Sequence, residues 1–360
     1  MLSPSTFREL ISGQRRGGLA AIARFGLRLT EFPYTWAVRW RNRRFDLGRL
    51  PISHVDVPVI SVGNLTLGGT GKTPVVEWLA RWFRQRQVRV SILSRGYGAG
   101  HSGMNDEALQ LALNLEDVPH LQNADRVVSA QIAMEEFFTQ LILLDDGFQH
   151  RRLARDLDVV LLDALEPFGW EHVFPRGTLR EPLTGLARAS AVLLSRAELL
   201  TPAERLQIKQ RVTKLAPQAE WAEITHAPQI LINADGQTTA LDSLRTARVA
   251  AFCGLGNPTG FRHTLRQLGY DVVYFQEFPD HYTYQRADIQ SLTDQFSQLE
   301  IQAILCTQKD LVKISLSQLG KIPLWAIKIG IEFVEGKEEL ERLLAPLAER
   351  AARVEYDELK

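Results

Sequence analysis

Apolar and polar residues follow two regular patterns along most of the chain. Short runs that are apolar throughout predict buried strands, and apolar residues every three or four positions predict helices. Between residues 58 and 197 the two patterns alternate: strands are predicted at 58–62, 88–93, 141–146, 157–164 and 189–195, and helices at 74–86 and 124–138. Because these strands are apolar on both faces, we predict a parallel sheet with helices on both sides.

The alternation starts again after residue 217. Strands are predicted at 248–256, 271–278, 303–307 and 323–329, and helices at 259–268, at 287–299 and from 337 onwards. We therefore predict an α/β protein with a larger parallel-sheet domain at 51–217 and a smaller α/β domain at 218–360.

The first 50 residues follow a different pattern. Leu19, Ile22, Phe25 and Leu29 share one side of a helix predicted over 18–32, and Trp36 and Trp40 follow one turn apart. Ten arginines stand here against three acidic residues. A basic amphipathic helix with aromatic residues is typical of a segment that lies on a membrane surface. The alternative is a helix that packs on the protein's own core.

A glycine-rich loop joins the first predicted strand to the first helix of the larger domain. It ends in Gly71, Lys72 and Thr73, as in the phosphate-loop pattern G-x-x-x-x-G-K-[ST], although Thr66 stands where that pattern has glycine. In such loops backbone N–H groups bind phosphate oxygens, the lysine reaches the β- and γ-phosphates and the hydroxyl binds Mg²⁺. A plain glycine turn would leave Lys72 and Thr73 unexplained. The predicted nucleotide-binding residues are Thr66, Leu67, Gly68, Gly69, Thr70, Gly71, Lys72 and Thr73.

Acidic residues follow the strand predicted at 141–146. Asp145 and Asp146 end this apolar run, a position that suits the binding of Mg²⁺ in a phosphate-loop enzyme; a helix cap is the alternative. Gln149 and His150 come next, at the carboxyl edge where open α/β sheets bind ligands. Weaker candidates occupy polar segments elsewhere, where a helix cap, a surface loop or a structural histidine is the plainer interpretation: Asp106, Arg180, Glu181, Asp280 and His281.

Composition and charge narrow the class of protein. Lys and Arg total 42, and so do Asp and Glu, so no net field favours nucleic acid. Cys253 and Cys306 lie in apolar strand-like runs, as buried thiols of a reducing compartment do. The sequence shows neither an apolar run long enough to span a membrane nor a signal peptide. These features predict a folded cytosolic protein.

The motifs, taken together and in this order, resemble one known family. "VGNLTLGGTGKTPVV", "DDGFQH", "PRGTLREPL" and "FPDHYTY" are similar to segments of the tetraacyldisaccharide 4'-kinases of lipid A biosynthesis. The likeness runs from about residue 20 to the C-terminal helix, and threonine is usual in this family at the position of Thr66. It implies transfer of the γ-phosphate of ATP, with Mg²⁺, to the 4'-hydroxyl of a tetraacylated glucosamine disaccharide 1-phosphate, which gives lipid IV-A.

The resemblance also implies a setting and roles for individual residues. It implies a peripheral protein on the cytoplasmic face of the inner membrane. Such a protein binds no nucleic acid and needs no obligate protein partner. It also implies that the smaller domain closes the active-site cleft. Lys72 and Thr73 would hold the phosphates and Mg²⁺, and Asp106 would act as the base beside His281. The remaining implied site residues are Asp145, Asp146 and Glu181 around the metal, and Arg180, Asp280, Gln149 and His150 along the site.

Two other classes of protein share the loop. A soluble sugar or nucleoside kinase would leave the basic, aromatic N-terminal segment unexplained. A membrane-associated switch ATPase with a phosphate loop would bind partners instead of modifying a lipid. Its characteristic loop carries a lysine at the position of Leu67, so the sequence favours the lipid kinase.

Overall fold

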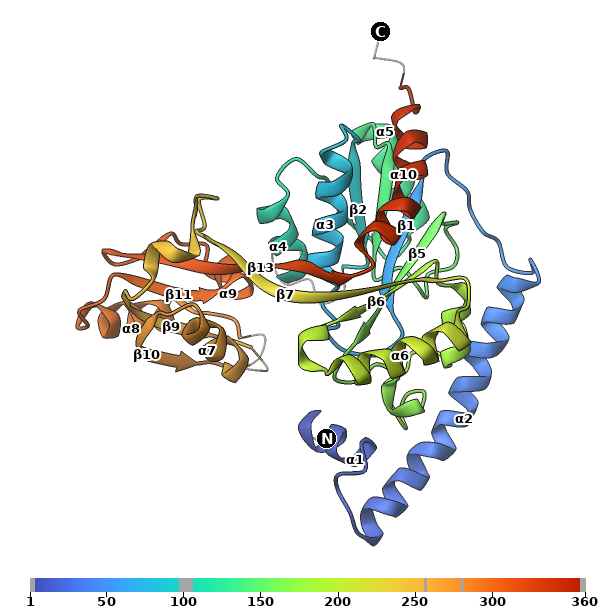
Figure 1. Ribbon diagram of the computed structural model, residues 1–360, viewed down its shortest axis with the longest axis horizontal. Coiled ribbons are helices and arrows are strands. Elements are labelled where there is room, and N and C mark those ends of the chain that lie inside the picture. Colours follow the sequence, from blue (N-terminus) through green and yellow to red (C-terminus); the bar gives the residue numbers. More distant parts are fainter. Residues whose placement is uncertain (1–3, 97–105, 256–257, 280–281, 357–360) are drawn as a thin grey trace. The chain divides into compact units, whose positions relative to one another are not determined.

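The computed structural model describes residues 4–96, 106–255, 258–279 and 282–356 (Figure 1). The chain forms two compact units. The first comprises Met1–Arg95, Val118–Thr225 and Glu332–Lys360, and the second Gly96–Asp117 and His226–Ile331. This division differs from the predicted boundaries, because the C-terminal helix belongs to the first unit and the segment before residue 118 to the second. The predicted α/β class is confirmed.

The first unit is built on a parallel sheet. The strands lie in the order β7 (Glu220–Ile232), β6 (Ala191–Ser195), β5 (Leu157–Asp163), β1 (Val59–Asn64), β4 (Leu141–Asp145), β2 (Val90–Ser94) and β3 (His120–Gln122). From β7 to β3 each neighbouring pair of strands runs parallel. Almost all residues of the inner strands are buried, as their largely apolar sequences predict.

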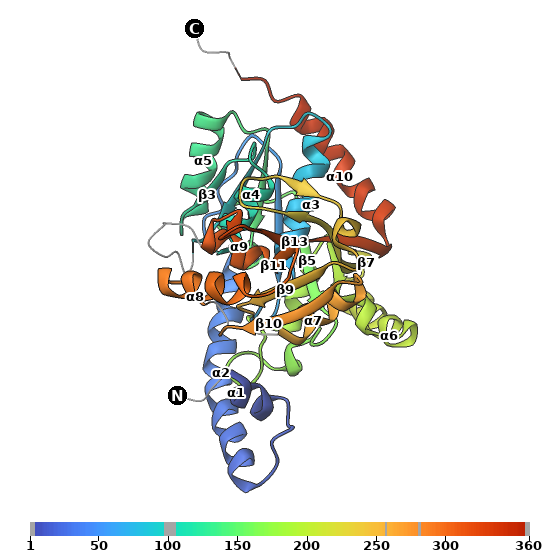
Figure 2. The ribbon, with the colours of Figure 1, turned by 90° about the vertical axis from the view of Figure 1, so that its left-hand side faces the viewer.

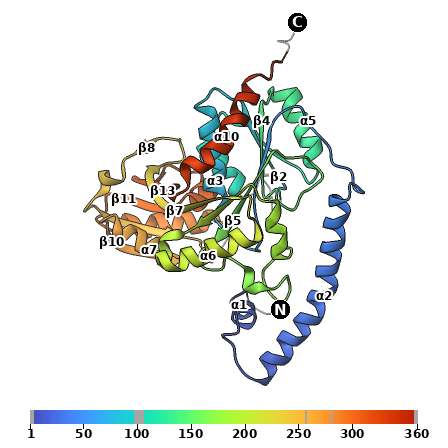
Figure 3. The same ribbon diagram turned by 45° about the vertical axis from the view of Figure 1, so that its right-hand side comes forward.

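Helices cover both faces of this sheet. α3 (Lys72–Arg84) and α10 (Lys337–Ala352) lie on one face and α5 (Arg126–Phe137) on the other, as Figures 2 and 3 show from two sides. α6 (Pro202–Leu215) packs with the short helix η2 (Leu183–Arg188) over β5 and β6. Two further 3₁₀ turns, η1 (Gly169–Glu171) and η3 (Ala197–Leu199), complete the unit.

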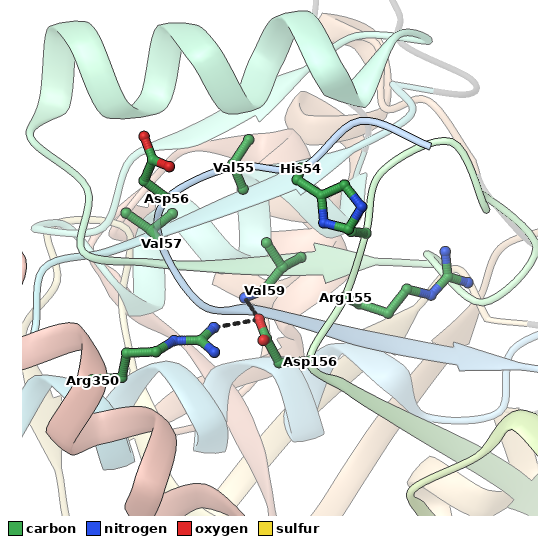
Figure 4. Close-up of a pocket in the computed structure, with 9 residues that line it drawn as sticks. His54, Val55, Asp56, Val57, Val59, Arg155, Asp156 and Arg350 are labelled. Atoms are coloured by element: carbon green, nitrogen blue, oxygen red, sulfur yellow. Dashed lines mark hydrogen bonds and ion pairs between the residues drawn. The ribbon is translucent and has the colours of Figure 1, made fainter. Parts of the chain in front are cut away.

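Specific contacts explain why α10 belongs to the first unit. Trp82 of α3 donates to Glu341, with 3.1 Å between Nε1 and Oε1. Asp156 accepts from the backbone N of Val59 at 2.8 Å and pairs with Arg350 at 2.6 Å, at the amino ends of β1 and β5 (Figure 4). Gly336 precedes the helix at φ +83°, where a Cβ would lie 2.2 Å from the backbone oxygen of Trp221. This entry to α10 therefore requires glycine.

Two helices precede the sheet of the first unit. α1 (Pro4–Ile11) is short, and α2 (Gly18–Asp46) continues through Pro33 as one long helix. α2 is tied to its unit by polar groups: Glu31 accepts from the backbone N of Val173 at 2.9 Å, and Asp46 pairs with Arg151 at 2.7 Å. In the described part of the chain, no helix has the combination of length and apolarity needed to cross a membrane.

The second unit contains four parallel strands. They lie in the order β10 (Asp271–Glu277), β9 (Arg248–Cys253), β11 (Ala303–Thr307) and β13 (Ile322–Glu335). α7 (Pro258–Gln267) packs on one face, and α8 (Arg286–Ser297) and α9 (Gln308–Ile314) pack on the other. Cys253 and Cys306 are buried and free, as predicted. The unit also contains α4 (Asp106–Asn114), β8 (Thr238–Thr239), η4 (Leu241–Leu244) and β12 (Gln318–Leu319). The short strands β8 and β12 pair antiparallel with β7 and β13.

Candidate nucleotide-binding site

The predicted phosphate loop connects the carboxyl end of β1 to the amino end of α3. Gly71 caps the helix with φ +80°, a conformation that favours glycine, and Lys72 and Thr73 begin its first turn. A Cβ on Gly69 would have no heavy atom within 4 Å, so the loop is open on that side. The side-chain oxygen of Thr70 is buried with no hydrogen-bond partner in the described structure. An open glycine loop at a helix N-terminus fits a phosphate group.

A second segment of the first unit supports this loop. The backbone N of Leu67 donates to the backbone oxygen of Thr178 at 2.7 Å, and Thr66 forms a β-bridge with Leu179. Thr66 itself is buried. Thr66, the residue that departs from the general pattern, is therefore bridged to the segment around Leu179 and is closely packed.

Lys72 lies beside the acidic end of β4. Its Nζ is 3.3 Å from Oδ1 of Asp146 and 3.5 Å from Oδ1 of Asn64. β1 and β4 are neighbours, with Val62 opposite Asp145, so the loop and the two aspartates share one edge of the sheet. Asp145 is buried, and Asp146 follows it at φ +55°. The structure thus brings Lys72, Asp145 and Asp146 together.

Arg180 is the second cation on Asp146. Its Nη1 donates to both carboxylate oxygens, at 2.8 and 2.7 Å, and its Nε donates to the backbone oxygen of Thr66 at 3.1 Å. Burial raises the pKa of Asp146, but Lys72 and Arg180 outweigh this effect, so the pKa lies below its usual value. The carboxylate stays ionised at neutral pH.

Glu181 is fully buried next to these residues. Its Oε1 accepts from Arg188 at 2.8 Å and from Gln149 at 3.0 Å, and its Oε2 accepts from Asn42 of α2 at 2.7 Å. It lines a cavity of about 270 Å³ between α2 and η2. Gln149 also donates to the backbone oxygen of Asn64, which links Glu181 to the phosphate loop.

His150 lies two residues after Phe148, in a strongly basic environment. Burial and the neighbouring guanidinium groups, first that of Arg126, lower the pKa of His150 to about 4. Its Nε2 is buried without a hydrogen-bond partner in the described part of the molecule. The ring is therefore neutral at physiological pH.

Asp106 begins α4 in the second unit. Its Oδ2 is 2.9 Å from Nζ of Lys313 on α9. The neighbouring turns of these helices are joined by polar side chains, with Gln308 3.1 Å from Gln110 and 2.8 Å from Asn114. The other half of the predicted dyad, His281, and its neighbour Asp280 lie outside the described residues.

Several residues of this neighbourhood escaped the sequence analysis. Asn64 closes β1 and contacts Lys72, and Arg196 donates to the backbone oxygen of Gly69 at 3.2 Å while it pairs with Asp163. Asn64 lies within the glycine-loop motif, which could have drawn attention to it. Nothing near Arg196, Arg188 or Asn42 in the sequence indicates their partners.

The side chains present fit a nucleotide with Mg²⁺. Thr73 offers a hydroxyl and Asp145 and Asp146 offer carboxylates, and such hard oxygen ligands suit Mg²⁺ together with substrate phosphates. Among the described residues, no three His, Cys, Asp or Glu side chains form a metal site of their own.

The fold and this site define a class of protein, an ATP-dependent phosphate-loop kinase that uses Mg²⁺. Its features are a parallel sheet, a glycine loop that ends in Lys72 at a helix N-terminus, and aspartates on the adjacent strand. The chain belongs to the tetraacyldisaccharide-1-P 4'-kinase family, whose model matches residues 23–348. The family that the sequence resembles is thereby confirmed.

Named relatives and a solved structure agree with this assignment. A tetraacyldisaccharide 4'-kinase of Anaeromyxobacter dehalogenans (strain 2CP-C) is 37% identical over 351 residues, which cover 92% of this chain and 93% of the relative. One of Halothermothrix orenii is 34% identical, with 87% and 88% covered. A crystal structure titled the "apo" form of LpxK from Aquifex aeolicus in complex with ATP is 31% identical, with a TM-score of 0.74 and coverage of 90% of this chain and 99% of that chain.

Proposed function

We propose that this chain transfers the γ-phosphate of ATP to the 4'-hydroxyl of a tetraacylated glucosamine disaccharide 1-phosphate and so forms lipid IV-A in lipid A biosynthesis. One observation carries the proposal: within a chain that belongs to this kinase family, Lys72 ends a phosphate loop 3.3 Å from Asp146. No feature favours the switch ATPase, since Leu67 occupies the position where that class has lysine.

Residues of the first unit hold the nucleotide in this proposal. ATP with Mg²⁺ supplies the transferable phosphoryl group and neutralises part of its charge. Lys72 leaves Asp146 and binds the β- and γ-phosphates, while the N–H groups of residues 66–73 surround them. Thr73, Asp145 and Asp146 are the proposed oxygen ligands of the metal, with Glu181 close by. Arg180 and Gln149 line the site through the contacts described above, and His150 is the third proposed lining residue.

A sugar hydroxyl must lose its proton when it becomes phosphorylated. We propose Asp106 as the acceptor, with His281 beside it to orient the carboxylate or share the charge, and Asp280 nearby. Lys313, 2.9 Å from Asp106, keeps a carboxylate oxygen in a defined position. Because a base is effective only when it is positioned, Lys313 belongs to the proposed base as a positioning residue.

The exposed side of α2 supports a membrane-surface location. Glu31, Val38 and Phe45 face the rest of the unit, whereas one stripe of large apolar side chains is exposed: Leu19, Ile22, Phe25, Leu29, Phe32, Trp36 and Trp40. We propose that this stripe lies in the interfacial layer of the inner membrane, on its cytoplasmic face, where acyl chains anchor the substrate. The sequence left packing on the core as an alternative, and the exposure of these side chains argues against it.

A transfer assay tests the proposed function. Purified protein is incubated with [γ-³²P]ATP, Mg²⁺ and a tetraacylated disaccharide 1-phosphate in mixed micelles, and the lipid is extracted. We expect label in the lipid fraction, and none with Lys72→Ala. Label released only as inorganic phosphate, at a rate independent of the lipid, would instead support the switch ATPase.

A further inference from the structure

The short helix α1 carries an arginine to the phosphate loop. Its residues, Pro4–Ile11, precede the segment that the family model matches, which begins at residue 23. We propose that Arg8 is a catalytic residue that binds the terminal phosphate of the nucleotide and stabilises its charge during transfer. This inference rests on the proposed function for the identity of the acceptor but not for the contact with the nucleotide.

Firm contacts hold α1 in place. Leu10 and Ile11 are buried, and the backbone oxygen of Ile11 accepts from Nη1 of Arg176 at 3.0 Å. Phe7 packs against Phe174, with 6.4 Å between the ring centroids. The segment 174–180, which supplies these contacts, also supports the phosphate loop through Thr178. The same segment therefore fixes the position of α1 and that of the loop.

α2 holds the C-terminal end of α1 in position. Nη1 of Arg24 donates to the backbone oxygen of Arg15 at 2.8 Å and lies 3.5 Å from that of Leu10. Arg24 thus bridges the end of α1 and the turn that leads into α2. Arg8 therefore belongs to a helix that is packed on the first unit.

Arg8 lies beside the middle of the loop. A Cβ built on Gly68, the third residue of the phosphate-loop pattern, would be 3.9 Å from Nη2 of Arg8. The following residue, Gly69, faces open space. The guanidinium therefore lies next to the side of the loop that is open to a phosphate group.

The other cations at the loop already have partners. Lys72 and Arg180 both contact Asp146, and Arg196 is paired with Asp163. Within the described ranges of the chain, the guanidinium of Arg8 forms no hydrogen bond or ion pair, although its backbone oxygen accepts from the N–H of Ser12 at 2.9 Å. Its acidic neighbour is Glu166, whose carboxylate is hydrogen-bonded to Thr178. Among the described cations named here, Arg8 is thus the one whose charged group is available for a ligand.

In phosphoryl transfer an arginine can stabilise the charge that develops on the transferred phosphate. As the bond from the 4'-oxygen to the γ-phosphorus forms, the bond from that phosphorus to the β–γ bridging oxygen breaks, and charge shifts on to the phosphate oxygens. Arg8 would donate two N–H groups to these oxygens, a geometry that guanidinium provides and ammonium does not. An arginine in this role contributes about 10³- to 10⁵-fold in kcat.

The test separates binding of the nucleotide from stabilisation of the transferring group. Dissociation constants are measured by calorimetry for Mg²⁺·ADP alone and with aluminium fluoride, which mimics the phosphoryl group in flight. The variants are Arg8→Ala, Arg8→Lys and, as a control on the same segment, Arg16→Ala. We expect Arg8→Ala to weaken the fluoride complex about 10³-fold, the lower end of the range for such arginines, with ADP affinity little changed. Arg8→Lys should recover part of the loss, and Arg16→Ala should match the wild type.

Three results would overturn the proposal. One is an equal effect of Arg8→Ala on both complexes, or no effect. Another is wild-type protein that gains no affinity for Mg²⁺·ADP from the fluoride. The third is a loss in Glu166→Gln as large as that in Arg8→Ala, because Arg8 would then act only as the counter-ion of Glu166. No lipid is present, so failure of the proposed acceptor leaves this measurement intact.

Discussion

Replacement of the two exposed tryptophans of α2 tests the membrane-surface location quantitatively. Trp36 and Trp40 have 63% and 53% of their surface exposed. Their rings stack at 6.3 Å, and the guanidinium of Arg44 lies 4.8 Å above Trp40, so the pair is one ordered apolar surface with a cation at its edge. Because neither ring packs on the core, the Trp36→Ser, Trp40→Ser double variant should fold normally.

The expected loss of binding follows from this exposed area. If a tryptophan presents up to about 250 Å², the two rings expose about 300 Å² together. If half of this surface enters the lipid, its burial contributes about 3–4 kcal/mol at about 25 cal/mol per Å². The double variant should therefore bind vesicles a few hundred-fold more weakly. The arginines of α2 add attraction to anionic lipid that salt weakens over a Debye length of about 10 Å at 0.1 M.

The assay is sedimentation with sucrose-loaded anionic vesicles over a range of salt, with Phe137→Ser as the matched control. Phe137 is an exposed aromatic residue at the end of α5 and is not part of α2. The double variant should also lose activity on vesicle-embedded substrate and keep it in mixed micelles, where the substrate reaches the enzyme without docking. Vesicle binding equal to that of the wild type, or equal losses in the variant and the control, would exclude a membrane-binding role for Trp36 and Trp40.

Three further changes probe the site. Lys72→Ala should abolish transfer with an unchanged Tm, because Arg180 still neutralises Asp146; substantial turnover would exclude the phosphate-loop assignment. Asp106→Ala and His281→Ala should each lower kcat about 10²- to 10⁴-fold, and the double variant should be little worse than the poorer single one; multiplied losses would mean independent roles. Since burial and basic neighbours lower the pKa of His150 to about 4, the unfolded chain takes up a proton there at higher pH than the folded one. The unfolding free energy should thus fall as the pH drops from about 6.5 to about 4, and less steeply in His150→Gln when followed by denaturant titration.

The larger features of the fold were predictable because buried strands and helices have characteristic patterns of apolar residues. The strand predicted at 141–146 is β4 (Leu141–Asp145), and that at 157–164 is β5 (Leu157–Asp163). A strand buried on both faces needs a largely apolar run, and such a run is visible without knowledge of its neighbours. The phosphate loop was predictable for a related reason, because its chemistry depends on adjacent residues.

Contacts between residues far apart in the sequence were not predictable in this way. α1 is eight residues long, and its partners Phe174 and Arg176 follow more than 160 positions later. α4 joins the second unit through polar contacts with Gln308, and the pattern of apolar residues along the sequence does not predict them. The partners of Glu181 come from α2, η2 and the segment after β4. The sequence therefore indicates which residues can do chemistry, whereas the fold determines which of them meet.

The position of the new phosphate identifies the reaction most directly. The wild-type protein is incubated with ATP, Mg²⁺ and the tetraacylated disaccharide 1-phosphate, and the extracted lipid is analysed by ³¹P–¹H correlation NMR. We expect a second phosphomonoester signal that correlates with the proton on C4' of the distal glucosamine and is absent with Lys72→Ala. A phosphate on another hydroxyl, or ATP hydrolysis without any new lipid phosphate, would contradict the proposed transfer to the 4'-hydroxyl.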